Sequence, residues 1–201
     1  MGLLSRSRIA IAAFGVALVL FGVACNDDDG GGPAATPTAL AEVTPADPAI
    51  IDGQIFISTA SGYRVEFPQG WTPDDNFLYT PDQVIDVFFG PAGTAEVQAN
   101  IQIRCDRETQ GFTSEEYIAA RRQVAEGFAI DQVQEQASTV AGVPAVMLTY
   151  QQRPGGTTTV DKTDVIFTGH GCGWTISLTE DPSEDQRPQL DAMLATFTFV
   201  G

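Results

Sequence analysis

Apolar and polar residues alternate over several stretches of this chain, which is the period of a β-strand with one buried face. In residues 63–67 the apolar Tyr63, Val65 and Phe67 are separated by charged residues. Ile55 and Ile57 predict a partner strand on the other side of a turn at Ser61-Gly62. The pattern therefore predicts a hairpin at the start of a folded region.

The clearest strand is expected at residues 97–105, where Val97, Ala99, Ile101, Ile103 and Cys105 share one face and polar residues share the other. Further strands are predicted at about residues 84–89, 133–140, 145–150, 159–168 and 173–179, with a short closing run at 197–200. Turn-forming Gly and Pro residues separate several of these segments.

Two helices are predicted among the strands. The segment Thr113-Ser114-Glu115-Glu116 has the spacing of a capping box, and the helix that it starts runs to about Gly127, with apolar residues at Tyr117, Val124 and Phe128. A second amphipathic helix contains Leu190, Met193, Leu194 and Phe197, and Pro188 suits its first turn. Strands that outnumber helices predict an α+β fold on a mainly antiparallel central sheet flanked by helices.

The amino terminus has the features of an export signal. Arg6 and Arg8 precede an apolar run at residues 9–24, whose 16 residues are fewer than the roughly 20 that a membrane-spanning helix needs. The run ends in Gly22-Val23-Ala24-Cys25, which resembles the lipobox of bacterial lipoproteins. The resemblance implies cleavage after residue 24 and acylation of Cys25 with chains such as palmitate. An ordinary cleaved signal or an uncleaved anchor helix are the alternatives.

Three regions follow from this interpretation. Residues 1–24 are the signal peptide, residues 25–49 are the lipidated cysteine and an acidic linker rich in Gly, Pro and Thr, and residues 50–201 are one folded domain. The linker has few large apolar side chains, so it cannot bury enough surface to offset the entropy of ordering. We expect it to tether the domain to the extracytoplasmic face of the cell membrane.

Acidic residues dominate the charge of the chain. It has 10 Lys and Arg against 26 Asp and Glu, a formal net charge of −16, and loss of Arg6 and Arg8 with the signal makes this −18. Because proteins bind nucleic acids largely through Lys and Arg, nucleic acid is not an expected partner.

Several segments of residues 54–200 together resemble the PsbP-like family. They are GYRVEFPQGW at 62–71, FTSEEYIAARRQ at 112–123, VAGVPAVMLTY at 140–150 and RPQLDAMLATFTF at 187–199. The family includes extrinsic photosystem II proteins and bacterial lipoproteins, and the resemblance implies its α/β/α sandwich. These segments are structural, and no catalytic motif accompanies them.

Two cysteines remain besides Cys25. Cys105 and Cys172 each lie in an alternating strand pattern, so both sulfurs are expected on the same side of neighbouring strands. In an oxidising compartment such a pair favours a disulfide, and two buried free thiols are the alternative.

Candidate chemistry elsewhere is sparse. His170 and Cys172 in Gly169-His170-Gly171-Cys172 fall short of the three or four ligands that zinc requires, so no metal and no cofactor are expected. Five aromatic residues are expected mainly in the core, although they are also candidates to line a cleft: Tyr63, Trp71, Tyr79, Tyr150 and Trp174.

Three functional hypotheses result. The favoured one is a non-enzymatic, membrane-anchored domain that binds or helps assemble envelope proteins. The second, implied by the resemblance, is a photosystem II-associated subunit linked to calcium. The third is a small-ligand carrier or hydrolase with a cleft near Trp71, Trp174 and His170.

Overall fold

The computed structural model of this chain describes residues 49–74, 78–107 and 112–200. The predicted signal peptide, Cys25 and all of the predicted linker except Ala49 lie outside the described residues. The described residues all belong to one compact unit.

A four-stranded antiparallel sheet contains the first hairpin and the end of the chain. Its strand order is β1-β2-β3-β12, with bounds Ala49–Asp52, Ile55–Ser58, Tyr63–Glu66 and Thr198–Phe199. The predicted pairing of Ile55 and Ile57 with the strand that begins at Tyr63 is confirmed, since β2 pairs antiparallel with β3.

A larger antiparallel sheet contains eight strands among the described residues, in the order β4-β6-β7-β11-β10-β9-β8, with β5 also paired to β6. The strands are β4 (Thr72–Pro73), β5 (Leu78–Tyr79), β6 (Gln83–Phe89), β7 (Asn100–Asp106), β8 (Gln134–Val140), β9 (Val143–Gln152), β10 (Val160–Gly169) and β11 (Cys172–Glu180). Two-residue turns at Ala141-Gly142 and His170-Gly171 join β8 to β9 and β10 to β11, and their positive φ values suit such tight hairpins.

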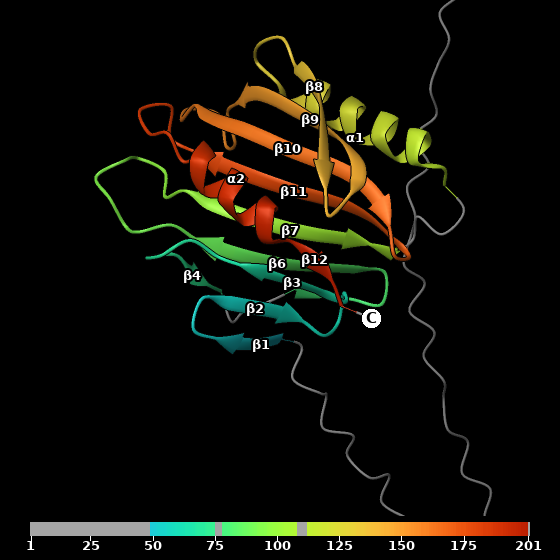
Figure 1. The fold of residues 1–201 in the computed structure, drawn as a ribbon. Helices are drawn as coiled ribbons and strands as arrows, with labels where there is room; N and C mark the ends of the chain where they lie inside the picture. The colour runs from blue at the N-terminus through green and yellow to red at the C-terminus, as the bar shows by residue number, and fades with distance from the viewer. Residues whose placement is uncertain (1–48, 75–77, 108–111, 201) are drawn as a thin grey trace, which may run out of the picture. The chain divides into compact units, whose positions relative to one another are not determined.

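The two helices lie on opposite faces of this large sheet (Figure 1). Helix α1 (Ser114–Phe128) packs on β9 and β10. Helix α2 (Arg187–Thr196) packs with β3 on the other face, where the four-stranded sheet also lies. The α+β fold with a mainly antiparallel sheet is therefore confirmed. The α/β/α sandwich stays a prediction, because the face opposite α1 is covered by a sheet together with a helix.

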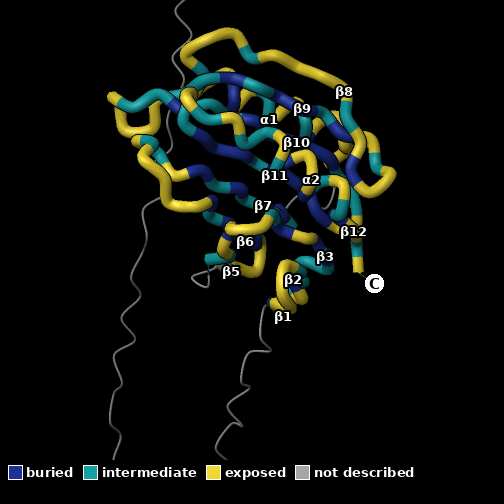
Figure 2. Tube along the Cα trace, turned by 60° about the vertical axis from the view of Figure 1, so that its left-hand side comes forward, coloured by how far each residue is buried: buried dark blue, intermediate teal, exposed yellow. Residues whose placement is uncertain are grey.

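The main core fills the space between the large sheet and the layer of α2 and the small sheet. Aromatic rings dominate it: Phe56, Tyr63, Phe88, Phe167, Trp174 and Phe197 are all fully buried. Figure 2 shows β11 buried along most of its length, whereas β1 and β8 are largely exposed. Strands at the centre of the sheet thus carry most of the apolar burial.

The predicted strand at residues 97–105 is shorter than its alternation suggests, because β7 begins only at Asn100. Its partner β6 ends at Phe89, and Gly90 with Pro91 then turns the chain away. The last backbone bond between the two segments is the one from Gly90 N–H to the Ala99 carbonyl, at 2.8 Å, and β6 offers no partner for residues 97 and 98.

The capping box of α1 is confirmed, with Thr113 and Glu116 bonded reciprocally. The predicted buried face of this helix is correct at Tyr117 and wrong at Val124 and Phe128, which are 44% and 66% exposed. Ala125 is buried in their place. The helix turns Tyr117 and Ala125 toward the sheet because Gly173, in the strand beneath it, admits the Tyr117 ring. No helix in the described part of the chain is long and apolar enough to cross a membrane.

Candidate binding pocket

Helix α1 is held against the large sheet through one close contact. A Cβ atom on Gly173 would lie only 2.6 Å from the Tyr117 ring. Real Cβ atoms do not approach so closely, so glycine is required at this point of β11 for the ring to rest on the strand. The contact fixes the start of α1 over the end of β7.

Asp106, at the end of β7, is the centre of a hydrogen-bond network on this face. Its Oδ1 accepts from Arg104 Nε at 2.7 Å and from Gln83 Nε2 at 2.8 Å. Its Oδ2 accepts from the Tyr117 hydroxyl at 2.9 Å, and that hydroxyl also contacts Thr175 Oγ1 at 3.1 Å. Residues from two strands and from α1 thus converge on one buried carboxylate.

The network sets the ionisation of both acids in it. Burial alone would raise the pKa of Asp106, but hydrogen bonds from Arg104, Gln83 and Tyr117, with the Arg104 charge, outweigh it and lower the pKa below the ordinary value. Burial and the nearby Asp106 raise the pKa of the Tyr117 hydroxyl well above the ordinary value. Near neutral pH Asp106 therefore stays ionised and Tyr117 stays protonated.

A cavity of about 430 Å³ opens above this network, between α1 and the turn that precedes β6. We call it the α1 pocket, and its lining residues are Thr80, Asp82, Gln83, Arg104, Asp106, Phe112, Tyr117 and Ala120. Its volume falls within the range of small-ligand sites, roughly 300–1,000 Å³. Because Phe112, Tyr117 and Arg104 are among its lining residues, the pocket is suited to a ligand that is part apolar and part charged.

Polar groups continue beneath α1 beyond the α1 pocket. Asp164 accepts hydrogen bonds from Tyr150 at 2.9 Å and from Ser177 at 2.6 Å. Lys162 Nζ donates to Thr179 Oγ1 at 2.7 Å, and burial lowers its pKa. These groups are satisfied within the sheet, so they stabilise the polar face of β10 and β11 and leave the α1 pocket as the better candidate site.

The structure contains the disulfide between Cys105 and Cys172 that the sequence analysis favoured. Cys105 pairs with Trp174, and Cys172 lies two residues before Trp174 on the same strand, so both thiols face one side. Their Cα atoms are 5.4 Å apart. The bond lies on the aromatic-core face of β7, opposite Arg104 and Asp106.

His170 occupies the turn between β10 and β11 and is exposed. Its ring stacks on Phe199, with centroids 3.7 Å apart. Among the described residues no group of three or more His, Cys, Asp or Glu side chains is placed to hold a metal ion. The structure thus places His170 in a hairpin turn.

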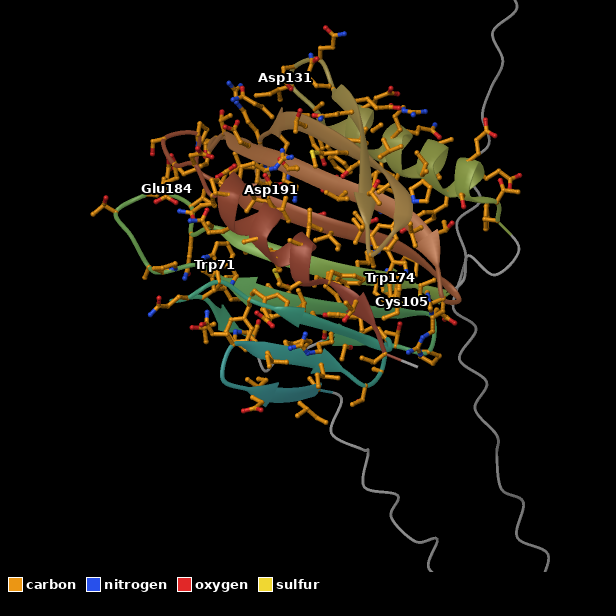
Figure 3. The ribbon with its side chains drawn as sticks, in the orientation of Figure 1. Trp71, Cys105, Asp131, Trp174, Glu184 and Asp191 are labelled. Atoms are coloured by element: carbon orange, nitrogen blue, oxygen red, sulfur yellow. A yellow bond between two sulfur atoms is a disulfide. The ribbon has the colours of Figure 1, made fainter. Side chains whose placement is uncertain are left out.

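The aromatic residues proposed for a cleft do not meet. Trp71 packs beside Gly90, near the end of β6, whereas Trp174 lies at the other end of the sheet beside Cys105 (Figure 3). Gly90 is level with Ala99 and Trp174 with Cys105, so the two positions differ by six residues along this strand, or about 20 Å. Trp71, Trp174 and Tyr63 are core residues, Tyr150 lies under α1, and the Tyr79 side chain is outside the described part of the chain.

The α1 pocket was not predicted from the sequence. Alternation placed Arg104 on the polar face of a strand, which gave no reason to distinguish it from other solvated charges. A signal was present in the helix, because Tyr117 is the aromatic residue one turn after the capping box. Only the pairing of β7 with β6 and β11 brings these residues together.

Comparisons with solved structures identify the architecture. The solution structure of cyanobacterial PsbP (CyanoP) from Synechocystis matches with a TM-score of 0.52 and 15% identity, covering 82% of this chain and 99% of that one. The expected likeness to PsbP is therefore confirmed at the level of the fold. This chain has a PsbP-like fold.

Two further solved structures also match this chain. A crystal structure from Bacteroides thetaiotaomicron has a TM-score of 0.52 and 13% identity, covering 75% of this chain, which spans only 50% of that protein. LpqN, described as involved in cell envelope biogenesis of Mycobacterium tuberculosis, has a TM-score of 0.46 and 13% identity over 69% of this chain and 83% of its own. No protein-family model and no curated protein matches the sequence.

Proposed function

We propose that this protein is a lipid-anchored, extracytoplasmic lipoprotein whose domain binds an envelope protein and does not catalyse a reaction. The α1 pocket is the proposed binding site. The observation that supports binding is the state of Asp106, a carboxylate that already accepts three hydrogen bonds.

A general acid or base works best when its pKa lies near the pH at which it operates. The pKa values of Asp106 and Tyr117 are displaced in opposite directions, away from neutrality. Neither group is therefore suited to exchange protons with a substrate. The same network instead holds Arg104 and Tyr117 in fixed positions, which lowers the entropic cost of binding a ligand.

The anchor is supported by the lipobox-like sequence before Cys25 and by the linker composition. Two or more acyl chains are needed for stable membrane attachment, and one chain gives only reversible binding. A linker that ends before Ala49, the first residue of β1, would allow the domain to reach a few tens of Å from the lipid. An envelope protein in the same membrane would then meet the α1 pocket at high effective concentration.

Fractionation of bacteria that express the full chain tests the anchor. The parent protein is expected in the membrane fraction, released by detergent and not by salt, with an intact mass that shows loss of residues 1–24 and gain of acyl chains. Cys25→Ser should move to the soluble extracytoplasmic fraction. A variant with Cys105→Ser and Cys172→Ser is the control and should stay on the membrane. Equal retention of Cys25→Ser would contradict the anchor.

Cross-linking on intact cells, followed by detergent solubilisation and recovery of the full chain, tests the binding site. Ala120→Trp fills the α1 pocket from an exposed helix position and breaks no hydrogen bond. Ala119→Trp adds the same ring at an exposed neighbour that does not line the pocket. The partner should be recovered with the parent and with Ala119→Trp, and lost with Ala120→Trp. The same recovery with both variants would reject the pocket as the binding site.

A further inference from the structure

We infer that the α1 pocket recognises a carboxylate that is attached to an apolar, preferably aromatic, group. This inference rests on the proposed function only in using the same pocket, and it names the chemistry that the pocket selects. It follows from how Arg104 is held, from the walls above it and from the charges around it.

The guanidinium of Arg104 is held through its Nε, which leaves Nη1 and Nη2 to bind a ligand. Its Nε donates to Asp106, and none of the hydrogen bonds in the described part of the chain uses Nη1 or Nη2. The two Nη atoms form an edge with parallel N–H groups, which matches the two oxygens of a carboxylate. About a third of the side chain is exposed, so this edge is accessible from the α1 pocket.

Asp106 does not compete for the same ligand position. Its oxygens are engaged by Arg104, Gln83 and Tyr117, which face it from β7, β6 and α1. The carboxylate therefore acts as a positioning group that orients the guanidinium. A ligand carboxylate would accept hydrogen bonds from Nη1 and Nη2, on the edge of the guanidinium that Asp106 does not contact.

The apolar residues that line the α1 pocket account for the apolar part of the ligand. Phe112, just before α1, is 57% exposed although its ring is large and apolar. It lines the pocket together with Tyr117 and the small Ala120. A ring on the ligand would cover the exposed part of Phe112, and burial of aromatic surface is favourable.

Asp82 is the second acidic residue of the lining and is exposed. Its negative charge weakens attraction of anions in general, as does the net charge of the chain. Selection must then come from the directed donors of Arg104 at short range, since exposed charges are screened beyond about 8 Å in physiological salt. A ligand that gains affinity here needs a carboxylate that reaches the guanidinium directly.

Two sources offer this chemistry: a free aromatic acid, and the chain end of a polypeptide with an aromatic last residue. N-acetylphenylalanine and its amide differ only in the carboxylate, so they form a matched pair of probes. A seven-residue peptide that ends in Phe, as the free acid and as the amide, distinguishes the second source. Binding is measured by chemical shifts of ¹⁵N-labelled protein that carries the native disulfide.

We expect the free acids to bind and the amides to bind at least about tenfold more weakly, because a hydrogen-bonded charge is lost. Arg104→Gln should weaken the acids by a similar factor and leave the amides unchanged. Arg153→Gln, a matched loss of charge outside the pocket, should have no effect. Asp82→Asn should tighten the acids by up to about fivefold, as removal of an exposed like charge would.

Ala120→Trp keeps the inference testable if Arg104→Gln does not fold, since it blocks the pocket without touching the network. It should abolish binding of the acids, whereas Ala119→Trp should not. Peptide acids that bind while N-acetylphenylalanine does not would assign the pocket to polypeptide ends, and binding of both would include free acids. Equal binding of acid and amide, no binding of any probe, or binding unaffected by Ala120→Trp would overturn the inference. If Ala120→Trp loses the partner while no probe binds the parent protein, the inference fails and the proposed function still stands.

Discussion

The two faces of the large sheet have different physical roles. The face toward α2 is packed with aromatic rings, among them Phe167 and Trp174, and carries the disulfide. The face toward α1 has a much smaller apolar cluster, and the rest of it consists of hydrogen-bonded polar groups and the α1 pocket. One face therefore provides most of the stability, and the other carries the polar groups that line the α1 pocket.

The largest effect is expected from truncating a ring on the aromatic face. Phe167→Ala removes a fully buried side chain and should lower the free energy of unfolding by about 3–5 kcal/mol. Val124→Ala changes an exposed residue on α1 and should stay within about 0.5 kcal/mol of the parent. Urea unfolding of both variants measures this difference. Equal losses would show that the two faces do not differ in the way described.

The disulfide gives the next largest effect on the same face. Replacing Cys105 and Cys172 together by Ala should cost about 4 kcal/mol, because the bond closes a long loop in the unfolded chain. Adding reductant should lower the stability of the parent toward that of the variant, and the variant itself should not respond. A parent protein whose unfolding is insensitive to reductant would contradict this prediction.

Gly173 tests the attachment of α1. Gly173→Ala places a methyl group against the Tyr117 ring and should destabilise the fold by about 1–3 kcal/mol, because the ring must move. It should also weaken binding in the α1 pocket. Gly127→Ala lies within α1 and faces open space, so it should instead stabilise by about 0.5–1 kcal/mol. Thermal unfolding of the pair would detect the opposite signs, and a harmless Gly173→Ala would refute the contact.

The smallest effect concerns pH. Because the pKa of Asp106 is lower in the folded protein than its ordinary value of 3.8, ionised Asp106 stabilises the fold above that pH, and this contribution is lost as pH falls through the folded value. The parent should lose more stability between about pH 5 and pH 2 than Asp106→Asn. Chemical denaturation at several pH values provides the measurement. Parallel pH profiles would argue against the lowered pKa.

Much of the local structure was predictable. Alternation located β3, β10 and β11 to within a residue or two, because a half-buried strand imposes a period of two on its sequence. The capping box located the start of α1 for the same local reason, since Thr113 and Glu116 satisfy amides only three residues apart. The full buried face of α1 was not predictable. Tyr117 was expected among its apolar residues, but the exposure of Val124 and Phe128 depends on how the Tyr117 ring rests on Gly173, 56 residues away in the chain.

The sequence by itself determined the periods of the strands, the ends of the helices, the acidic charge and the signal-like amino terminus, because each depends on neighbouring residues. Only the tertiary structure decided which polar residues are buried together. The lining of the α1 pocket comes from separate segments, which contribute Thr80 and Asp82, Arg104 and Asp106, and Tyr117. These segments meet because β7 pairs with β6 and β11 while α1 crosses the end of β7. Such pairing depends on packing between distant segments, which no local pattern records.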